Sequence, residues 1–167
     1  MLNPETQLSS IVDRDVFRDV ISNLVSGVSI ISSQRGNERF GVTASSVTSL
    51  SMDPASILVC LNQRLAITNV ISETGVFAVN ILGEDHGELA SQFATSHADK
   101  FRGTNVKNDS LGNPILADAL AHLECRVIER KDYATHAIFI AEIQSASSRL
   151  GSPLAYFRSS FGRFEME

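Results

Sequence analysis

Several residue types and patterns are scarce in this 167-residue sequence, and each shortage excludes a class of protein. Two cysteines are too few for a disulfide-based scaffold. Apolar runs such as 57–61 are far shorter than the roughly 20 residues that a membrane helix needs. The formal net charge is −5 and no block of five or more basic residues occurs, so the pattern that binds a phosphate backbone is missing. We expect neither a membrane nor a nucleic-acid partner.

Motifs of several enzyme classes are also missing. There is no Gly-x-Gly-x-x-Gly, no phosphate-binding Gly-Lys-Ser/Thr loop and no Gly-x-Ser-x-Gly elbow. The four histidines and two cysteines show no metal-ligand spacing, so no metal site is expected. Cys60 and Cys125 each lie in an apolar stretch and are interpreted as buried thiols. An enzyme with this sequence would therefore rely on a cofactor for its chemistry.

The composition is that of a soluble globular protein, with 43% apolar and 20% charged residues. A chain of this length buries enough surface for one core, so residues 1–167 are interpreted as a single domain. Residues 1–10 lack the basic start and apolar core of a signal peptide, which predicts a cytoplasmic protein. Residues 1–12 are expected to form a flexible extension.

Three amphipathic helices are predicted from apolar spacing near 3.6 residues. The first follows a cap at Asp13 or Asp15. Its apolar face consists of Val16, Phe17, Val20, Ile21 and Leu24. The second covers 66–74 and ends at Gly75, where a left-handed residue is expected. The third begins at Asp85.

Short runs that are β-branched or alternate in polarity predict strands. They cover 28–31, 40–43, 56–61, 77–82, 121–128, 137–141, 153–157 and 161–164. The polar segment 102–113 lacks periodicity and is expected to be a long loop that acts as a lid or a dimer arm. Six to eight strands, with helices only as insertions, predict a mainly β fold of the barrel type.

The segment 41–54 carries six hydroxyl side chains but no His, Lys or Glu that could activate one of them. It is expected to connect two strands. Two interpretations of the hydroxyls are open. They form either a polar edge in contact with solvent or the lining of a bound cofactor, where small side chains let backbone N–H groups approach a flat ring.

Six motifs follow one another along the chain. They are Phe17-Arg-Asp19, Gly27-Val-Ser-Ile-Ile31, Gly41-Val-Thr-Ala-Ser-Ser46, Ser49-Leu-Ser-Met-Asp-Pro54, Gly75-Val-Phe-Ala-Val-Asn-Ile-Leu82 and Pro153-Leu-Ala-Tyr-Phe-Arg158. Together they resemble the flavin reductase family, which supplies reduced flavin to two-component monooxygenases. The resemblance extends from Phe17 to Phe164.

This resemblance implies an FMN-binding split β-barrel with a Greek-key-like topology and a few flanking helices, which works as a homodimer. It also implies that the protein binds FMN or FAD and oxidises NADH or NADPH by hydride transfer from C4 of the nicotinamide to N5 of the flavin. Reduced flavin would then pass to a separate monooxygenase. The alternatives are a flavin-binding electron carrier or sensor without NAD(P)H turnover, and a non-enzymatic β-barrel interaction module.

The resemblance further implies roles for individual residues. Those expected to line the flavin ring are Thr43, Ala44, Ser45, Ser46, Val47, Ser49 and Leu50, with Gln92 and Phe93 beside it. Those expected at the flavin phosphate, where the second helix begins, are Asn62, Gln63, Arg64, Thr68 and Asn69. Those expected at the nicotinamide are Tyr156, Phe157, Arg158, Ser159 and His136, the last as the catalytic residue that orients the ring.

Two positions depart from the family pattern. Ala134-Thr135 stands where Gly-Asp usually precedes the histidine, and Ser159-Ser160-Phe161 stands where a Gly and a Tyr are usual. On the residues alone, core packing explains Phe93 equally well, and Arg64 can be read as a solvated surface charge.

Overall fold

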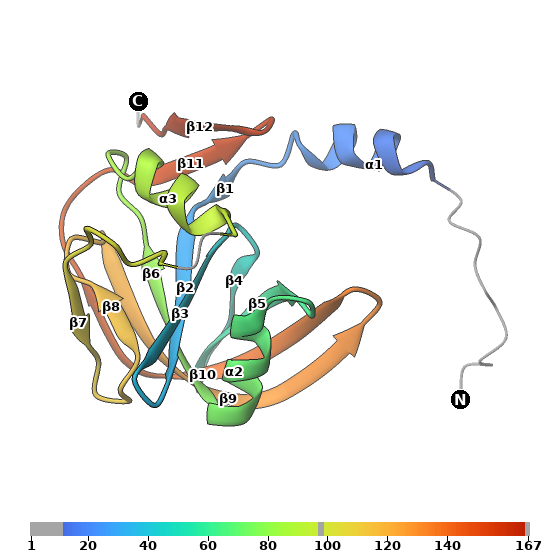
Figure 1. Ribbon diagram of the computed structural model, residues 1–167. Coiled ribbons are helices and arrows are strands. Elements are labelled where there is room, and N and C mark those ends of the chain that lie inside the picture. Colours follow the sequence, from blue (N-terminus) through green and yellow to red (C-terminus); the bar gives the residue numbers. More distant parts are fainter. Residues whose placement is uncertain (1–11, 97–98, 166–167) are drawn as a thin grey trace, which may run out of the picture.

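The computed structural model describes residues 12–96 and 99–165 (Figure 1). The expected flexible extension over residues 1–12 lies outside this part of the chain, except for its last residue. The helices are α1 (Arg14–Ile21), α2 (Ala66–Thr74) and α3 (Gly87–Ala94). The strands are β1 (Ser26–Gly27), β2 (Ser29–Arg35), β3 (Glu38–Ala44), β4 (Val47–Met52), β5 (Ala55–Asn62), β6 (Val76–Ile81), β7 (Val106–Asn108), β8 (Pro114–Leu116), β9 (Ala121–Tyr133), β10 (His136–Ser148), β11 (Leu154–Phe157) and β12 (Ser160–Arg163).

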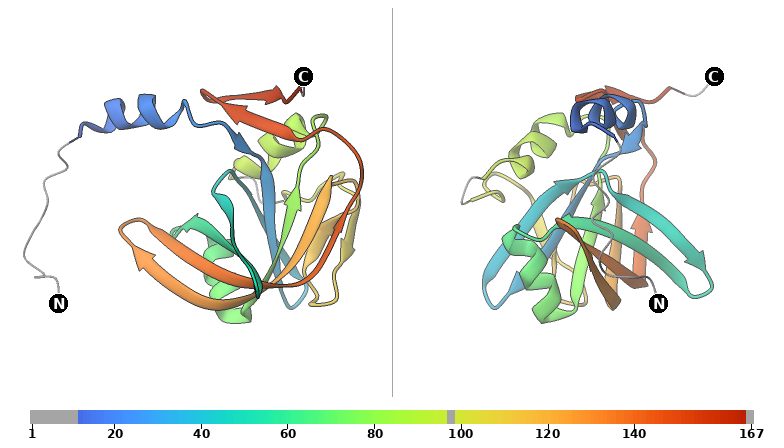
Figure 2. Two further views of the ribbon diagram at one scale, coloured as in Figure 1. Left: turned by 180° about the vertical axis from the view of Figure 1, so that it is seen from behind. Right: turned by 90° about the vertical axis from the view of Figure 1, so that its right-hand side faces the viewer.

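Seven strands form one antiparallel sheet in the order β3-β2-β6-β9-β10-β5-β4. Figures 1 and 2 show that this sheet is curled, and its two edge strands, β3 and β4, are joined by only Ser45 and Ser46. A small sheet of β1, β11 and β12 lies at one end, and β7 and β8 form a separate hairpin. The predicted mainly β, barrel-type fold is confirmed. The expected six to eight strands are fewer than the twelve in the described residues, because β1, β7 and β8 have only two or three residues and β4 is mostly polar and exposed.

Two apolar clusters lie on opposite faces of β2. Ile31 points into the curled sheet, where it joins Phe77 and Phe139 and where α2 inserts Ile67 and Ile71. Ile30 points the other way, into a second cluster that contains Leu82, Phe93 and Leu116. Successive side chains of a strand point to opposite faces, so the central strands are apolar on both sides. As a result, α3 and the β7–β8 hairpin can pack on the outer face of the sheet.

Helix α2 forms where the apolar spacing predicts it. It covers Ala66–Thr74 and ends at Gly75, whose φ of 71° is left-handed and whose amide donates to the Ile71 carbonyl. Helix α1 also forms, and the Asp13 side chain caps it by accepting from the amides of Asp15 and Val16.

The apolar face of α1 has no partner in the described part of the chain. Val16, Phe17 and Val20 are 55%, 59% and 64% exposed, and the helix lies at the end of the molecule, away from the curled sheet (Figure 1). An amphipathic helix is therefore present as predicted, and none of its residues is buried.

Two expectations about connecting segments need correction. The hydroxyl-rich segment 41–54 does more than connect strands, because it contains the end of β3 and all of β4, which pairs with β5. The segment 102–113 is not a free loop, because β7 lies within it and pairs with β8. Both segments lack the apolar alternation of a half-buried strand, since their outward residues contact solvent.

Asn80 attaches the β7–β8 hairpin to the sheet. Its fully buried side-chain amide donates to the Ile30 carbonyl at 3.0 Å and to the Ser32 hydroxyl at 2.9 Å, and its oxygen accepts the Leu116 amide at 2.8 Å. Ser32 in turn donates to the Pro114 carbonyl. All the polar atoms of the Asn80 side chain therefore have protein partners in a buried junction.

Replacing Asn80 with leucine is expected to lower the free energy of unfolding by about 3 kcal/mol, because the Leu116 amide and the Ser32 hydroxyl lose a partner in a buried environment. Urea unfolding followed by circular dichroism measures this difference. The matched control is Asn108→Leu on exposed β7, where the change is expected to stay within about 0.5 kcal/mol. Equal midpoints for the two variants would contradict the role of Asn80.

Candidate functional site

A cavity of about 470 Å³ lies where β3 bends into β4. Three segments that are distant in sequence surround it: the end of β3, the end of α3 and the β11–β12 hairpin. Its lining residues are Val28, Thr43, Ala44, Ser45, Ser91, Ala94, Thr95, Tyr156, Ser159 and Phe161. Five of the sequence-predicted residues are therefore brought together here: Thr43, Ala44, Ser45, Tyr156 and Ser159.

The wall formed by β3 is made of small residues at the edge of a sheet. Because β3 pairs only with β2, alternate backbone N–H and C=O groups point away from the sheet. The Thr43 hydroxyl donates to the Ala90 carbonyl at 2.6 Å and so attaches α3 to β3. At Gly41 the side chain of Phe93 from α3 lies directly against the β3 backbone, since a Cβ atom added to Gly41 would lie 2.5 Å from the Phe93 ring. This wall thus presents backbone groups of Thr43 and Ala44 that no second strand pairs with.

The hydroxyls of the segment 41–54 do not all serve the same purpose. Thr43 is bonded to α3, and Ser46 donates to the Cys60 carbonyl at 2.6 Å. Ser45 lines the cavity. On β4, Val47 packs against the core, whereas Ser49 and Leu50 are exposed. Part of the segment is therefore a polar edge strand and part of it is a cavity wall.

The β11–β12 hairpin forms the opposite wall. The rings of Tyr156 and Phe161 are 5.5 Å apart between centroids, and the turn between them contains Arg158 and Ser159 with positive φ angles of 44° and 63°. Arg158 points away from the cavity, because its guanidinium donates to the Asn23 side chain at 2.6 and 3.0 Å and its amide donates to the Ser22 carbonyl. Phe157 is half exposed.

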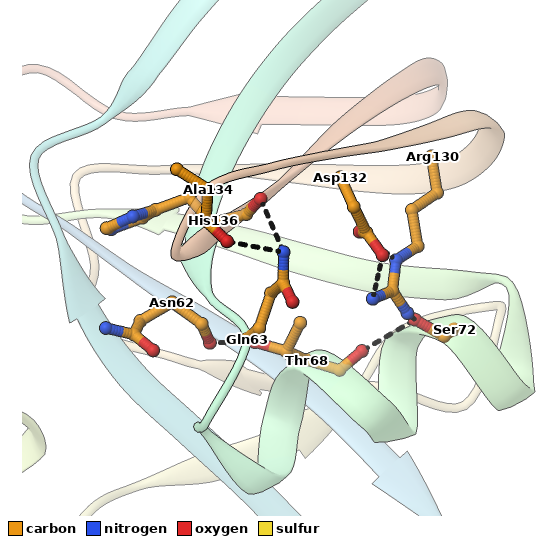
Figure 3. Close-up of polar contacts among 8 residues, drawn as sticks. All are labelled: Asn62, Gln63, Thr68, Ser72, Arg130, Asp132, Ala134 and His136. Atoms are coloured by element: carbon orange, nitrogen blue, oxygen red, sulfur yellow. Dashed lines mark hydrogen bonds and ion pairs between the residues drawn. The ribbon is translucent and has the colours of Figure 1, made fainter. Parts of the chain in front are cut away.

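His136 lies on the neighbouring part of the sheet and outside the lining of this cavity. It begins β10, opposite Asn62 of β5 (Figure 3). Its exposed imidazole lies 2.8 Å from the Thr135 hydroxyl. The backbone of Ser46 pairs with Cys60, two residues before Asn62. Ser46 and His136 are therefore offset by roughly 7 Å along β5, and because β5 lies between them, two strand spacings of about 4.8 Å also separate them across the sheet.

Most of the residues predicted at the start of α2 make bonds within the protein. Gln63 donates to the carbonyls of His136 and Ala134 at 3.0 and 3.4 Å and so supports the β9–β10 turn (Figure 3). Thr68 is fully buried and donates to the Asn62 carbonyl, while the Asn62 side chain accepts the Arg64 amide. The Arg64 guanidinium and the exposed Asn69 side chain are the groups of this set that remain open to solvent.

The two predicted site residues on α3, Gln92 and Phe93, make contacts that stabilise the fold. Phe93 is fully buried and packs edge-to-face on Phe101, with ring centroids 4.9 Å apart. Gln92 donates to the carbonyls of Lys100 and Arg102 at 2.7 and 3.0 Å, which holds the segment that follows the helix. Core packing therefore accounts for Phe93.

A second cavity, of about 400 Å³, is lined by two cationic residues for which the sequence predicts no role, Arg39 and Lys100. It adjoins the first cavity along β3 and is lined by Arg39, Arg64 and Lys100 among others. The Lys100 ammonium donates to the carbonyls of Gly41 and Phe93 at 3.1 and 3.0 Å, and burial lowers the pKa of Lys100. Arg39 and Lys100 are isolated in the sequence, so no local pattern identifies them.

Three further features of the described residues concern metal ligands, thiols and apolar helices. No group of three His, Cys, Asp or Glu side chains there could hold a metal ion. Cys125 is buried as expected, and burial strongly raises the pKa of its thiol, whereas Cys60 is half buried. No helix in the described ranges combines the length and the apolar character that a membrane span requires.

Two of the known proteins to which the chain is similar are named as reductases. The chain is 44% identical over 153 residues, 92% of this chain and 82% of the relative, to the reductase component of a 4-nitrophenol 4-monooxygenase/4-nitrocatechol 2-monooxygenase of Rhodococcus opacus. It is 33% identical over 162 residues, 94% of this chain and 85% of the relative, to a flavin reductase (NADH) of Kitasatospora aureofaciens.

A solved structure shares the fold. An NADH:FAD oxidoreductase of Streptomyces globisporus C-1027, in complex with NAD and FAD fragments, superposes with a TM-score of 0.87 at 28% identity and covers 92% of this chain and 93% of that one. The family described as "Flavin reductase like domain" matches residues 21–165. That match extends over most of the sequence and includes both cavities. The chain therefore belongs to the flavin reductase like domain family.

Proposed function

We propose that this protein catalyses the reduction of FMN or FAD by NADH or NADPH and releases reduced flavin to a separate flavin-dependent monooxygenase. The observation that carries this proposal is the cavity of small residues between β3, α3 and the β11–β12 hairpin, in a chain of the flavin reductase family. The reductase component named among its relatives supports a monooxygenase partner.

The residues of the cavity fit a flavin ring. Ala44, Ser45 and Ala94 are small enough to leave room for a flat ring, and Tyr156 and Phe161 supply an aromatic wall. The outward backbone groups of edge strand β3 can pair with the carbonyl and nitrogen atoms along one edge of such a ring. The cavity thus combines apolar faces with a polar edge, as the flavin does.

Hydride transfer requires the protein to position the two reactants, and it requires no nucleophile from the protein. A bound flavin supplies the hydride acceptor, and a reduced nicotinamide supplies the hydride. The residues of the cavity would hold the two rings next to each other, which would remove much of the entropic cost of the encounter. We assign to His136 the role of orienting the nicotinamide, since its imidazole is exposed and only β5 lies between its strand and the hydroxyl segment.

The direct test is the oxidation of NADH and NADPH by the purified protein with added FMN or FAD, followed by absorbance. Flavin-dependent consumption of either nucleotide is expected. Tight flavin binding without any consumption would instead support an electron carrier or sensor. A protein that neither binds flavin nor is stabilised by it against heat would be a β-barrel interaction module.

Ser45→Val is expected to weaken flavin binding about tenfold, because the branched side chain narrows the cavity and removes a hydroxyl from its polar edge. Quenching of flavin fluorescence measures the dissociation constant. Thr48→Val, on the exposed part of β4, is the matched control and is expected to leave this constant unchanged. Equal affinities in both variants would remove Ser45 from the site.

His136→Ala is expected to raise the KM for NADH about tenfold and to leave the flavin dissociation constant unchanged, because His136 lies outside the lining of the cavity assigned to the flavin. Steady-state kinetics at saturating flavin separates KM from kcat. His136→Asn retains a hydrogen-bond donor and is expected to recover part of the loss. A loss of flavin affinity equal to the rise in KM would contradict the assignment.

We also propose that the protein is a homodimer. Phe17 and Val20 on α1, together with Ile128 and Tyr133 on the β9–β10 hairpin, are 59%, 64%, 56% and 74% exposed. Burying each large apolar side chain contributes about 1.5–3 kcal/mol, so covering these surfaces with a second copy is favourable.

Phe17→Glu is expected to shift the protein from dimer to monomer, because it places a charge in the apolar face of α1. Analytical ultracentrifugation measures the association constant. Arg14→Glu adds the same charged group to a polar position of the same helix and is expected to leave the dimer intact. A monomeric wild-type protein at micromolar concentration would rule the homodimer out.

A further inference from the structure

The turn between β11 and β12 has a backbone shape that its own residues do not favour. It is a two-residue loop, because Phe157 pairs with Ser160 across the hairpin. Both residues of the loop have positive φ, 44° for Arg158 and 63° for Ser159. Two-residue loops with this backbone favour Asn-Gly, because residues with larger side chains rarely adopt positive φ. Contacts from outside the hairpin are therefore needed to hold the turn in this shape.

Those contacts come from the segment that follows α1. Figure 1 shows the turn beside this segment, which links α1 to β1. The amide of Arg158 donates to the Ser22 carbonyl at 3.0 Å. The guanidinium of Arg158 donates twice to the Asn23 side-chain oxygen, at 2.6 Å from Nη2 and at 3.0 Å from Nε. Within the described residues, these three bonds are the only hydrogen bonds between the turn and the chain outside its hairpin.

The Asn23 side chain makes bonds on both of its sides. Its amide nitrogen donates to the Asp19 and Val20 carbonyls at 2.8 and 3.4 Å, in the last turn of α1. Carbonyls at the end of a helix have no partner within the helix, so this donor satisfies groups that would otherwise depend on water. Because its nitrogen bonds the helix, its oxygen points to Arg158. A neutral side chain thus connects the end of α1 to the β11–β12 turn.

Asn23 and Arg158 lie outside the lining of the first cavity, whereas the next residue of the turn, Ser159, belongs to it. Tyr156, another lining residue, pairs with Ser26 of β1, three positions after Asn23. Strand β1 has only two residues and every residue of β12 is exposed, so this end of the wall gains little from strand pairing or from the core. The bonds of Arg158 extend the attachment of β11 to β1 as far as the turn.

We propose that Asn23 is a positioning residue for the cavity assigned to the flavin. Through the Arg158 guanidinium it holds the β11–β12 turn in its positive-φ shape, and so keeps Ser159 at the cavity wall next to Tyr156. This proposal rests on the proposed function, because it concerns the wall of the same cavity. It also gives Arg158 a role other than contact with the nicotinamide, since its donors bond the segment after α1.

Asn23→Ala is expected to weaken flavin binding about fivefold, since residues that share a hydrogen-bond network couple by energies of this order. Arg158→Ala is expected to have the same effect, and the double variant is expected to lose no more affinity than either single one. Quenching of flavin fluorescence measures the dissociation constants, and circular dichroism checks that each variant is folded. At saturating flavin, kcat is expected to stay within about twofold of the unmodified value, because neither side chain contacts a reacting group.

Two further variants test whether the shape of the turn is the cause. Asn23→Asp keeps an oxygen acceptor for the guanidinium and is expected to recover most of the affinity that Asn23→Ala loses. Ser159→Gly introduces a residue that adopts positive φ readily, so adding Asn23→Ala to it is expected to have little further effect on flavin binding. General destabilisation by Asn23→Ala would instead lower the unfolding midpoint equally with Ser or Gly at position 159.

The matched control is Ser22→Ala. It removes a hydroxyl that donates to the same Asp19 carbonyl at 2.7 Å, but it keeps the backbone carbonyl that accepts from Arg158. Flavin affinity is expected to be unchanged in this variant, although the end of α1 loses a hydrogen bond as it does in Asn23→Ala.

Two results would overturn the proposal. One is that Asn23→Ala binds flavin as tightly as the unmodified protein does. The other is that the losses in Asn23→Ala and Arg158→Ala add in the double variant, since Arg158 would then contact the ligand itself. Oxidation of NADH with flavin by the unmodified protein would leave the proposed function intact in either case. If the unmodified protein neither binds nor reduces flavin, the proposed function fails, and the role of Asn23 fails with it.

Discussion

The close approach of α3 to β3 at Gly41 is the constraint on which both cavities depend. The Phe93 ring lies against the backbone of Gly41, at a distance that leaves no room for a Cβ atom. The Thr43 hydroxyl bonds the Ala90 carbonyl, and the Lys100 ammonium bonds the carbonyls of Gly41 and Phe93. These contacts fasten the helix and the segment after it to one edge strand. The first cavity forms on one side of this junction and the second cavity on the other.

The parts of the fold that were predictable from sequence are those with local causes. Helix α2 and its end at Gly75 follow from apolar spacing and from a residue that tolerates positive φ. The strand that His136 opens is apolar in sequence because both of its faces are covered or half covered. In the candidate site, five of the residues that the resemblance singles out line one cavity: Thr43, Ala44, Ser45, Tyr156 and Ser159. What these features share is that adjacent residues are enough to identify them.

The parts that sequence did not reveal depend on contacts between distant residues. Lys100 reaches back to Gly41, and Asn80 joins a hairpin more than thirty positions away. Gln63 and Thr68 look like ligands for a phosphate, yet backbone carbonyls of the protein take their hydrogen bonds. Polar side chains satisfy whichever partner the fold brings near, because a buried donor without a partner costs about 1–3 kcal/mol. Composition at a helix start therefore identifies a polar region, but it does not say which groups stay available to a ligand.

The position of α1 connects assembly with the wall of the flavin cavity. Arg158 bonds the carbonyl of Ser22 and the side chain of Asn23 just after this helix, and the next residue, Ser159, lines the cavity. The two residues of the hairpin turn hold positive φ angles, so the turn keeps this shape only while its bonds are made. A molecule that packs on the apolar face of α1 holds the helix in place and, through Arg158, holds the turn as well. Covering α1 should thus order the cavity wall beside Tyr156, which links the proposed dimer to flavin binding without requiring a partner residue inside the cavity.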